Sequence, residues 1–123
     1  MGLTVLIVDD HPTFRRFARR LLEEAGFQVV GEAADGSSAM VAACDLAPDA
    51  VLLDVLLPDR SGLEIASELA RRLKATAVVL TSSRSASDLG VALAETPKKG
   101  FIPKSAFSGR AFTELVSPDA PLA

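Results

Sequence analysis

Three carboxylates of this 123-residue chain stand at the ends of apolar segments, where a charge is unexpected. Asp9 and Asp10 come directly after LTVLIV (3–8), and Asp54 ends AVLLD (50–54). An ionised carboxylate is costly to bury unless it is paired with a cation or bound to a metal. These three residues are therefore the first candidates for chemistry.

Two further kinds of polar group occupy the same position in other segments. The hydroxyls of Thr81 and Ser82 end AVVLTS (77–82), and the ammonium of Lys104 follows GFIP (100–103). If these segments are parallel strands, their carboxyl ends meet at one edge of a sheet. Carboxylates, a hydroxyl and an ammonium would then share one pocket.

Carboxylates held that close must be neutralised. Two unit charges about 4 Å apart repel by roughly 4 kcal/mol at an effective dielectric of 20. Either one carboxyl takes up a proton or a cation lies among them. Oxygen ligands favour Mg²⁺, with Mn²⁺ as the alternative, and such a site beside a lysine and a hydroxyl indicates phosphoryl chemistry. We interpret His11 as a solvated loop residue rather than a metal ligand.

The apolar segments predict the elements that position these groups. Several of the segments are apolar throughout, which is typical of strands buried on both faces of a parallel sheet. Alternation of strands and helices with right-handed crossovers predicts an α/β fold, a doubly wound five-stranded parallel sheet with helices on both faces. The expected strands are 3–8, 29–33, 50–54, 77–82 and 100–103, and the expected helices are 12–25, 37–46, 62–73, 86–95 and 106–116.

Helical spacing also predicts the environment of single residues. In the first helix, Phe14 and Phe17 fall on the face expected to be buried, and the arginines form a solvated face. Cys44 is expected to be a small buried helix residue, and Ser105 to cap the last helix.

The segments LIVDDHP, VLLDVLLPDRSGLE, LTSS and GFIPK resemble, in order, the motifs of response regulator receiver domains of bacterial two-component signalling, the CheY-like superfamily. The resemblance covers roughly residues 3–116. The spacings from Asp54 to Ser82 and from Ser82 to Lys104 are usual for that family. The resemblance implies a flavodoxin-like sheet with strand order 2-1-3-4-5.

The resemblance also implies a role for each matching residue. Asp54 would accept a phosphoryl group from a phosphohistidine on a sensor histidine kinase or a phosphotransfer protein. Asp10, Asp54 and the backbone carbonyl of Leu56 would hold Mg²⁺, while Asp9 would act through water or by orienting the site. Lys104 would pair with a phosphoryl oxygen.

Two residues would form a switch that responds to phosphorylation. Ser82 would hydrogen-bond a phosphoryl oxygen, and Phe101, where the family more often has Tyr, would turn into the space that Ser82 leaves. Thr81 is the alternative hydroxyl, although spacing favours Ser82. The chain departs from the family at Ser105, where Pro is frequent, and in AETPKKG (94–100), so the output surface is expected to be unusual.

We interpret residues 1–117 as one receiver domain and 118–123 as a flexible C-terminal tail. We expect the chain to be a phosphoprotein in which phosphorylation reshapes a protein-interaction surface. It is expected to catalyse only its own phosphorylation and dephosphorylation. Three alternatives are a receiver fragment of a longer DNA-binding regulator, a Mg²⁺-dependent phosphohydrolase and a degenerate receiver that serves as a scaffold. Such phosphohydrolases usually carry Asp-x-Asp on the first strand, whereas the acids here are adjacent.

Composition narrows the class of partner. With 49% apolar and 24% charged residues, the chain suits a compact soluble domain. Its net charge of −3 offers no general attraction to nucleic acid or to an anionic membrane. We expect a cytoplasmic protein whose downstream target, not named by the sequence, is another protein or an output domain. A phosphorylation-dependent homodimer is also compatible with the resemblance.

Overall fold

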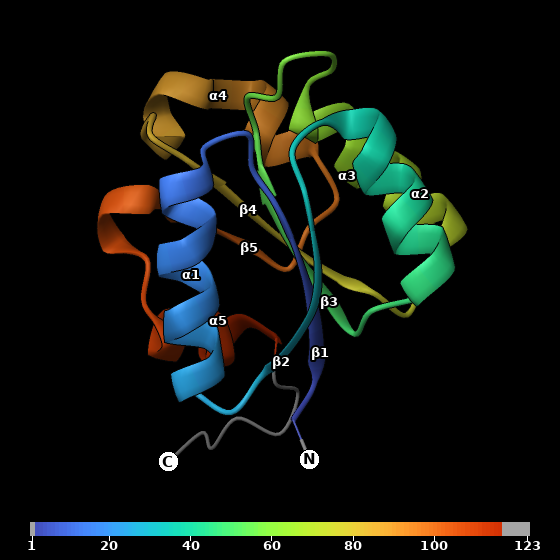
Figure 1. Cartoon of the computed structure of the whole chain (residues 1–123). Coiled ribbons are helices and arrows are strands. Elements are labelled where there is room, and N and C mark those ends of the chain that lie inside the picture. The colour runs from blue at the N-terminus through green and yellow to red at the C-terminus, as the bar shows by residue number, and fades with distance from the viewer. Residues whose placement is uncertain (1, 117–123) are drawn as a thin grey trace.

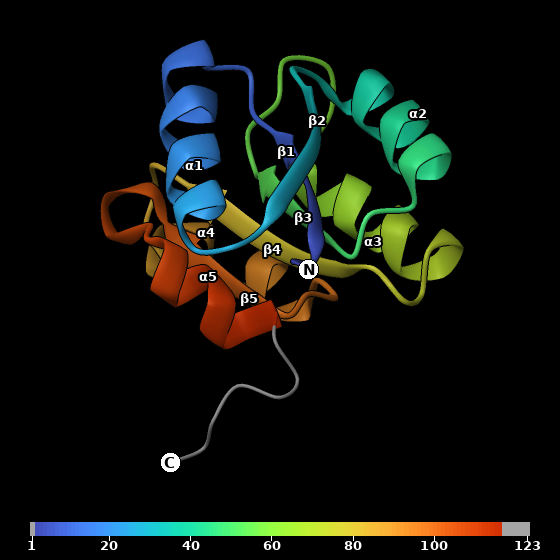
Figure 2. The same cartoon turned by 60° about the horizontal axis from the view of Figure 1, so that its bottom comes forward.

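The computed structural model describes residues 2–116 and shows a parallel sheet covered by helices on both faces (Figures 1 and 2). The strand order is β2-β1-β3-β4-β5, and each neighbouring pair is parallel, which confirms the predicted fold class and order. The elements are β1 (Thr4–Val8), α1 (Pro12–Glu24), β2 (Gln28–Ala33), α2 (Gly36–Leu46), β3 (Ala50–Asp54), α3 (Gly62–Arg72), β4 (Ala77–Ser82), α4 (Ala86–Glu95), β5 (Gly100–Pro103), a 3₁₀ turn (Lys104–Ala106) and α5 (Gly109–Val116).

Side chains that alternate along the strands divide the core into two layers. Val5, Ile7 and Leu52 pack on one face of the sheet with residues of α1 and α5. Leu6 and Leu53 pack on the other face with residues of α2, α3 and α4. Figure 2 shows α1 and α5 on one side of the sheet and α2 and α3 on the other. Because alternation has a period of two, it also decides which polar side chains at the strand ends share a face.

The last helix begins later than predicted. Ser105 does not cap it, because this residue lies within the 3₁₀ turn that follows β5. α5 instead begins at Gly109, and the hydroxyl oxygen of Ser108 accepts a hydrogen bond from the backbone N–H of Ala111 at 3.0 Å. The 3₁₀ turn Lys104–Ala106 therefore connects β5 to α5.

Two residues predicted to be buried are exposed. The ring of Phe17 is 39% exposed and lies 5.9 Å from the guanidinium of Arg20, because it falls at the edge of the buried stripe of α1. Cys44 is also exposed, since the buried stripe of α2 passes through its neighbour Ala43. Helical spacing predicts the direction of a buried stripe but not its width.

Helix α4 is bent at Gly90, which has φ 64° and ψ −141°. Residues other than glycine rarely adopt this backbone conformation. Beyond the bend, Leu93 is the buried residue of the helix, and Nζ of Lys98 donates to the carbonyl oxygens of Leu93 at 2.8 Å and Thr96 at 3.2 Å. The second half of α4 is thus anchored to the domain, while Val91 on its outer side is 70% exposed.

Residues 2–116 contain no helix that is both long and apolar enough to cross a membrane. The predicted tail, residues 118–123, lies outside the described residues, and so does the boundary at residue 117.

Replacement of Gly90 by Ala tests the bend in α4. A Cβ at this position would meet no other atom, so the cost would come from the backbone conformation alone. We expect Gly90→Ala to lower the free energy of unfolding by about 1–3 kcal/mol, measured by urea denaturation. Val91→Ala, at an exposed site in the same helix, should leave stability nearly unchanged. A Gly90→Ala protein at least as stable as the wild type would mean that α4 is continuous in solution.

Candidate functional site

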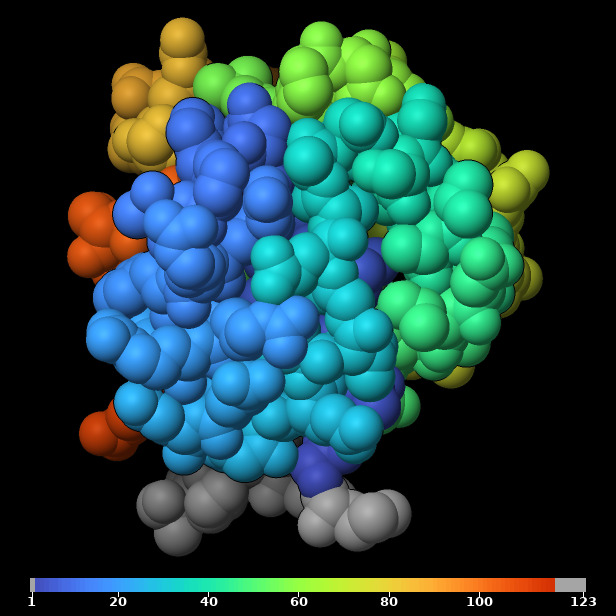
Figure 3. All heavy atoms as spheres, viewed as in Figure 1, coloured from blue at the N-terminus to red at the C-terminus, as the bar shows by residue number. Residues whose placement is uncertain are grey.

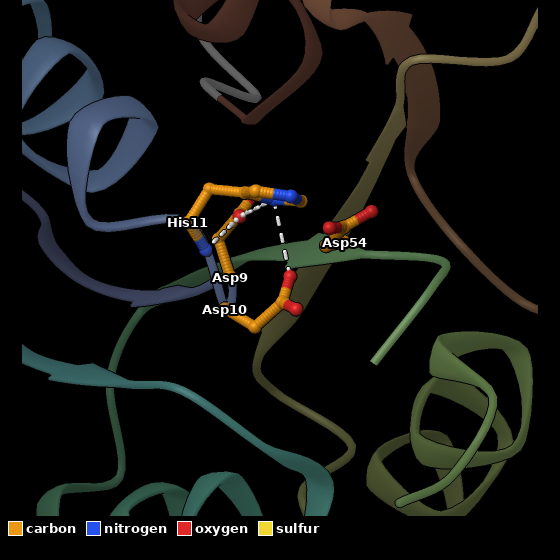
Figure 4. Close-up of side chains that lie close together, drawn as sticks. All are labelled: Asp9, Asp10, His11 and Asp54. Atoms are coloured by element: carbon orange, nitrogen blue, oxygen red, sulfur yellow. Dashed lines mark hydrogen bonds and ion pairs between the residues drawn. The ribbon is translucent and has the colours of Figure 1, made fainter. Parts of the chain in front are cut away.

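The loop after β1 brings two carboxylates and an imidazole together (Figure 4). Nδ1 of His11 lies 3.1 Å from Oδ1 of Asp9 and 3.1 Å from Oδ1 of Asp10, and the backbone N–H of His11 donates to Asp9. The side chain of Asp9 is buried, whereas that of Asp10 is 36% exposed. The start of α1, which follows these residues in the chain, gathers with the loop after β3 and with α4 at one end of the molecule (Figure 3).

Asp54 ends β3 and is joined to Asp9 by Lys104. Nζ of Lys104 lies 2.7 Å from Oδ2 of Asp9 and 3.3 Å from Oδ2 of Asp54. Both carboxylates are almost completely buried. The backbone N–H of Leu56 donates to Oδ1 of Asp54 at 3.2 Å. The ends of β1, β3 and β5 therefore meet at one site, as their parallel arrangement requires. We call this site, made by Asp9, Asp10, Asp54 and Lys104, the acidic pocket.

The negative charge in this pocket exceeds what one ammonium can neutralise. Burial raises the pKa of Asp54 to about 6 and repulsion from Asp9 adds to that, while Lys104 and the N–H of Leu56 act in the opposite direction. Ligand atoms of Asp9, Asp10, Asp54 and His11 all lie within 4.8 Å of one another. Three converging carboxylates are the donors that a hard divalent cation prefers, so the residues present fit Mg²⁺.

The two hydroxyls at the end of β4 are both buried but lie on opposite faces of the sheet. Thr81 pairs with Asp54 and, like Val79, belongs to the side of α1 and α5. Ser82 belongs with Leu80 to the side of α4. The hydroxyl oxygen of Ser82 accepts from the backbone N–H of Arg84 at 3.0 Å, whereas that of Thr81 has no hydrogen-bond partner among the described residues.

Phe101 lies on the same face of the sheet as Ser82. Its ring is partly buried against the core layer that contains Leu80, Leu89 and Leu93, and its backbone is paired with Leu80. Leu89 and Leu93 come from the two sides of the bend in α4. The aromatic ring of Phe101 therefore packs against the core layer to which the bent helix α4 contributes.

The loop between β3 and α3 is held close to Asp54. A Cβ on Gly62 would collide with the backbone carbonyl oxygen of Asp54, so this approach requires glycine. At the tip of the loop, the carboxylate of Asp59 accepts hydrogen bonds from the backbone N–H groups of Gly36 at 2.7 Å and Ser37 at 3.0 Å, which lower the pKa of Asp59. The loop that carries Leu56 is thus tied to the first turn of α2.

Arg15 and His11 contact the acidic residues in ways that sequence reasoning missed. Nη1 of Arg15 donates to the backbone carbonyl of Asp9 at 2.6 Å, and its Nε pairs with Glu32 of β2 at 3.0 Å. The arginine is therefore not simply part of a solvated face, and its side chain is only 19% exposed. The position of Arg15 in the first turn of α1, shortly after the acidic pair, could have indicated its contact with Asp9. Its contact with Glu32 could not be predicted in this way, because Glu32 becomes a neighbour only through the pairing of β1 with β2.

A family model for the response regulator receiver domain matches residues 5–116. The matched range contains every residue of the acidic pocket and both predicted switch residues. Because this match covers most of the chain, it shows which family the chain belongs to.

Curated relatives agree with this family. The nitrate/nitrite response regulator protein NarP of Escherichia coli is 42% identical over 102 residues, which are 81% of this chain and 47% of NarP. A protein-glutamate methylesterase/protein-glutamine glutaminase of Hahella chejuensis is 35% identical over 91 residues, which are 74% of this chain and 26% of that protein. The chain spans less than half the length of these relatives.

Solved structures show the same fold. The signal receiver domain of a NarL protein from Mycobacterium tuberculosis has a TM-score of 0.87 and 28% identity, covering 95% of this chain and 98% of that one. A LuxR-family two-component response regulator from Aurantimonas sp. SI85-9A1 has a TM-score of 0.78 and 30% identity, covering 85% and 76%. The chain therefore belongs to the response regulator receiver family of bacterial two-component signalling.

Proposed function

We propose that this chain accepts a phosphoryl group on Asp54 from a phosphohistidine of a sensor histidine kinase or a phosphotransfer protein, in a Mg²⁺-dependent reaction. The observation that carries the proposal is the position of Lys104, whose ammonium lies 3.3 Å from Asp54 and 2.7 Å from Asp9. An ammonium beside the acceptor is placed to neutralise the charge that an incoming phosphoryl group brings.

The reaction exchanges one bond to phosphorus for another. A carboxylate oxygen of Asp54 forms the new P–O bond while the N–P bond of the donor breaks, and the donor imidazole keeps the electron pair. Asp10, Asp54 and the carbonyl oxygen of Leu56 would hold Mg²⁺, with Asp9 acting through water or by orienting the site. When bound, the ion supplies charge neutralisation between the phosphoryl oxygens and the carboxylates.

The switch follows from the charge that phosphorylation adds, about −1.5 to −2. In this proposal the hydroxyl of Ser82 leaves the N–H of Arg84 and donates to a phosphoryl oxygen. Phe101 then moves into the space that Ser82 vacates. Because both residues lie on the α4 side of the sheet and Phe101 belongs to the edge strand β5, which α4 and α5 flank from opposite faces, the movement alters the surface made by α4, β5 and α5.

The surface that changes is proposed to act on a protein, either an output domain of a longer polypeptide or a separate partner, with a phosphorylation-dependent homodimer as one form. The identity to NarP, a longer response regulator, supports the first form. Adjacent acids after β1 and a central acid on β3 favour a receiver over a phosphohydrolase. We also propose that residues 1–117 form the domain and that it acts in the cytoplasm.

Asp54→Asn tests the site of phosphorylation. After incubation with acetyl phosphate and Mg²⁺, we expect intact mass spectrometry to show one added phosphoryl group on the wild type and none on Asp54→Asn, because an amide is a poor nucleophile. Asp45→Asn, which removes an exposed acid of α2, should be phosphorylated like the wild type. Equal phosphorylation of the Asp54→Asn protein would place the acceptor elsewhere.

Removal of the cation tests the role of the acidic residues after β1. We expect chelation by EDTA to stop phosphorylation by acetyl phosphate and added Mg²⁺ to restore it. Asp10→Asn should raise the Mg²⁺ concentration needed for half-maximal rate by at least about tenfold, because one ionic ligand is lost. An unchanged rate in EDTA would refute a metal-dependent reaction.

The choice between the two hydroxyls can be tested with beryllofluoride, which mimics a phosphoryl group. We expect Mg²⁺ and beryllofluoride to shift the aromatic NMR signals of Phe101 in the wild type and in Thr81→Val. In Ser82→Ala the signals should stay near those of the free protein, although the variant still binds beryllofluoride. The reverse pattern would assign the switch to Thr81.

A further inference from the structure

The ammonium of Lys104 is contacted on one side by carboxylates and on another by an aromatic ring. Its Nζ lies 4.6 Å from the centroid of the Phe14 ring, in addition to its ion pairs with Asp9 and Asp54. The side chain of Lys104 is only 16% exposed. A desolvated ammonium over a ring face is attracted by the ring quadrupole, so Phe14 supplies a third contact that directs this cation.

The ring of Phe14 is itself fixed by other aromatic residues. It packs edge-on against Phe107, with centroids 5.8 Å apart and planes at 68°, and Phe107 in turn packs against the fully buried Phe112 at 6.3 Å. The backbone N–H of Phe107 donates to the carbonyl of Lys104 across the 3₁₀ turn. Phe14 of α1 therefore contacts both ends of the turn that presents the lysine.

A pocket of about 470 Å³ opens beside this contact. Lys104 itself lines this pocket, so its side chain borders space that solvent can enter. The ion pair with Asp54 is the longer of the two, at 3.3 Å, and the shorter one, at 2.7 Å, is made with Asp9 rather than with the acceptor. The pocket is lined by His11, Thr13, Phe14, Phe17, Ser83 and Lys104.

We propose that Phe14 is a positioning residue for phosphoryl transfer, because its ring face keeps the ammonium of Lys104 beside Asp54. This inference rests on the proposed function, since it concerns the group that neutralises the incoming phosphoryl. The attraction to a ring face extends to about 6 Å from the ring centroid, and the ammonium of Lys104 lies inside that range at 4.6 Å. The lysine can therefore move from the carboxylate to a phosphoryl oxygen without losing its contact with Phe14.

The test compares Phe14→Leu, Phe14→Tyr and Phe17→Leu. Phe14→Leu keeps an apolar side chain but removes the ring, whereas Phe14→Tyr restores a ring face. Phe17→Leu is the control for loss of a neighbouring ring: Phe17 lies 6.2 Å from Phe14 and lines the same pocket, but its ring is paired with Arg20 rather than with Lys104. Urea denaturation of each variant reports any loss of stability separately from activity.

With acetyl phosphate as donor, we expect Phe14→Leu to lower the maximal rate of phosphorylation by about three- to tenfold. The Mg²⁺ concentration for half-maximal rate should stay unchanged, because the carboxylates are intact. Phe14→Tyr should recover the rate. In the wild type, the ring should also shift the ε-methylene proton signals of Lys104 upfield in NMR spectra, and this shift should be absent in Phe14→Leu.

The possible results separate the two proposals. A wild-type protein that takes up no phosphoryl group would refute the proposed function and this inference with it. If the wild type is phosphorylated and Phe14→Leu reacts as fast as Phe17→Leu, only the role of Phe14 is refuted. If Phe14→Leu unfolds, Phe14→Tyr decides the question. A Phe14→Tyr protein that reacts at the wild-type rate and keeps the upfield shift of the Lys104 signals supports the role of the ring. Wild-type Lys104 signals without an upfield shift would overturn that role.

Discussion

Repulsion between carboxylates that the fold removes from water is the constraint on which the rest of the site depends. The parallel sheet brings Asp9 and Asp54 to adjacent strand ends, where both are nearly inaccessible to solvent. Lys104 from the end of β5 offsets part of that repulsion, and a divalent cation would offset more. The apolar strands thus determine where the acids lie, and the acids in turn require the cations. The chemistry follows from a charge imbalance that the backbone topology creates.

The sheet could be predicted from sequence because its strands are apolar almost throughout and its charged groups follow them directly. Once the strands are taken as parallel, the meeting of Asp9, Asp54 and Lys104 is a consequence of topology alone. Contacts made across the fold were harder to predict. The pairing of Arg15 with Glu32 depends on a neighbouring strand, and the exposure of Phe17 depends on the width of the buried stripe of α1. Such contacts are determined by tertiary packing, which helical spacing does not describe.

The two layers of the core separate the proposed phosphoryl acceptor from the proposed switch residues. Asp54, Thr81 and the lysine belong to the side of the sheet covered by α1 and α5, where a series of aromatic rings packs from Phe14 to Phe112. Ser82 and Phe101 belong to the opposite side, next to the bent helix α4. A single step along β4, from Thr81 to Ser82, therefore passes from the core layer of α1 and α5 to the core layer that contains the bent helix α4. This explains why adjacent hydroxyls are not equivalent.

Asp59 joins the loop beyond the acceptor to the beginning of α2 through two backbone hydrogen bonds. That attachment lies on the flank of the molecule remote from β5. Any displacement of the loop would therefore stretch the hydrogen bonds that the backbone N–H groups of Gly36 and Ser37, at the start of α2, donate to Asp59. The loop that carries Leu56 is consequently connected to the side of the sheet opposite β5 as well as to β3, where the loop begins.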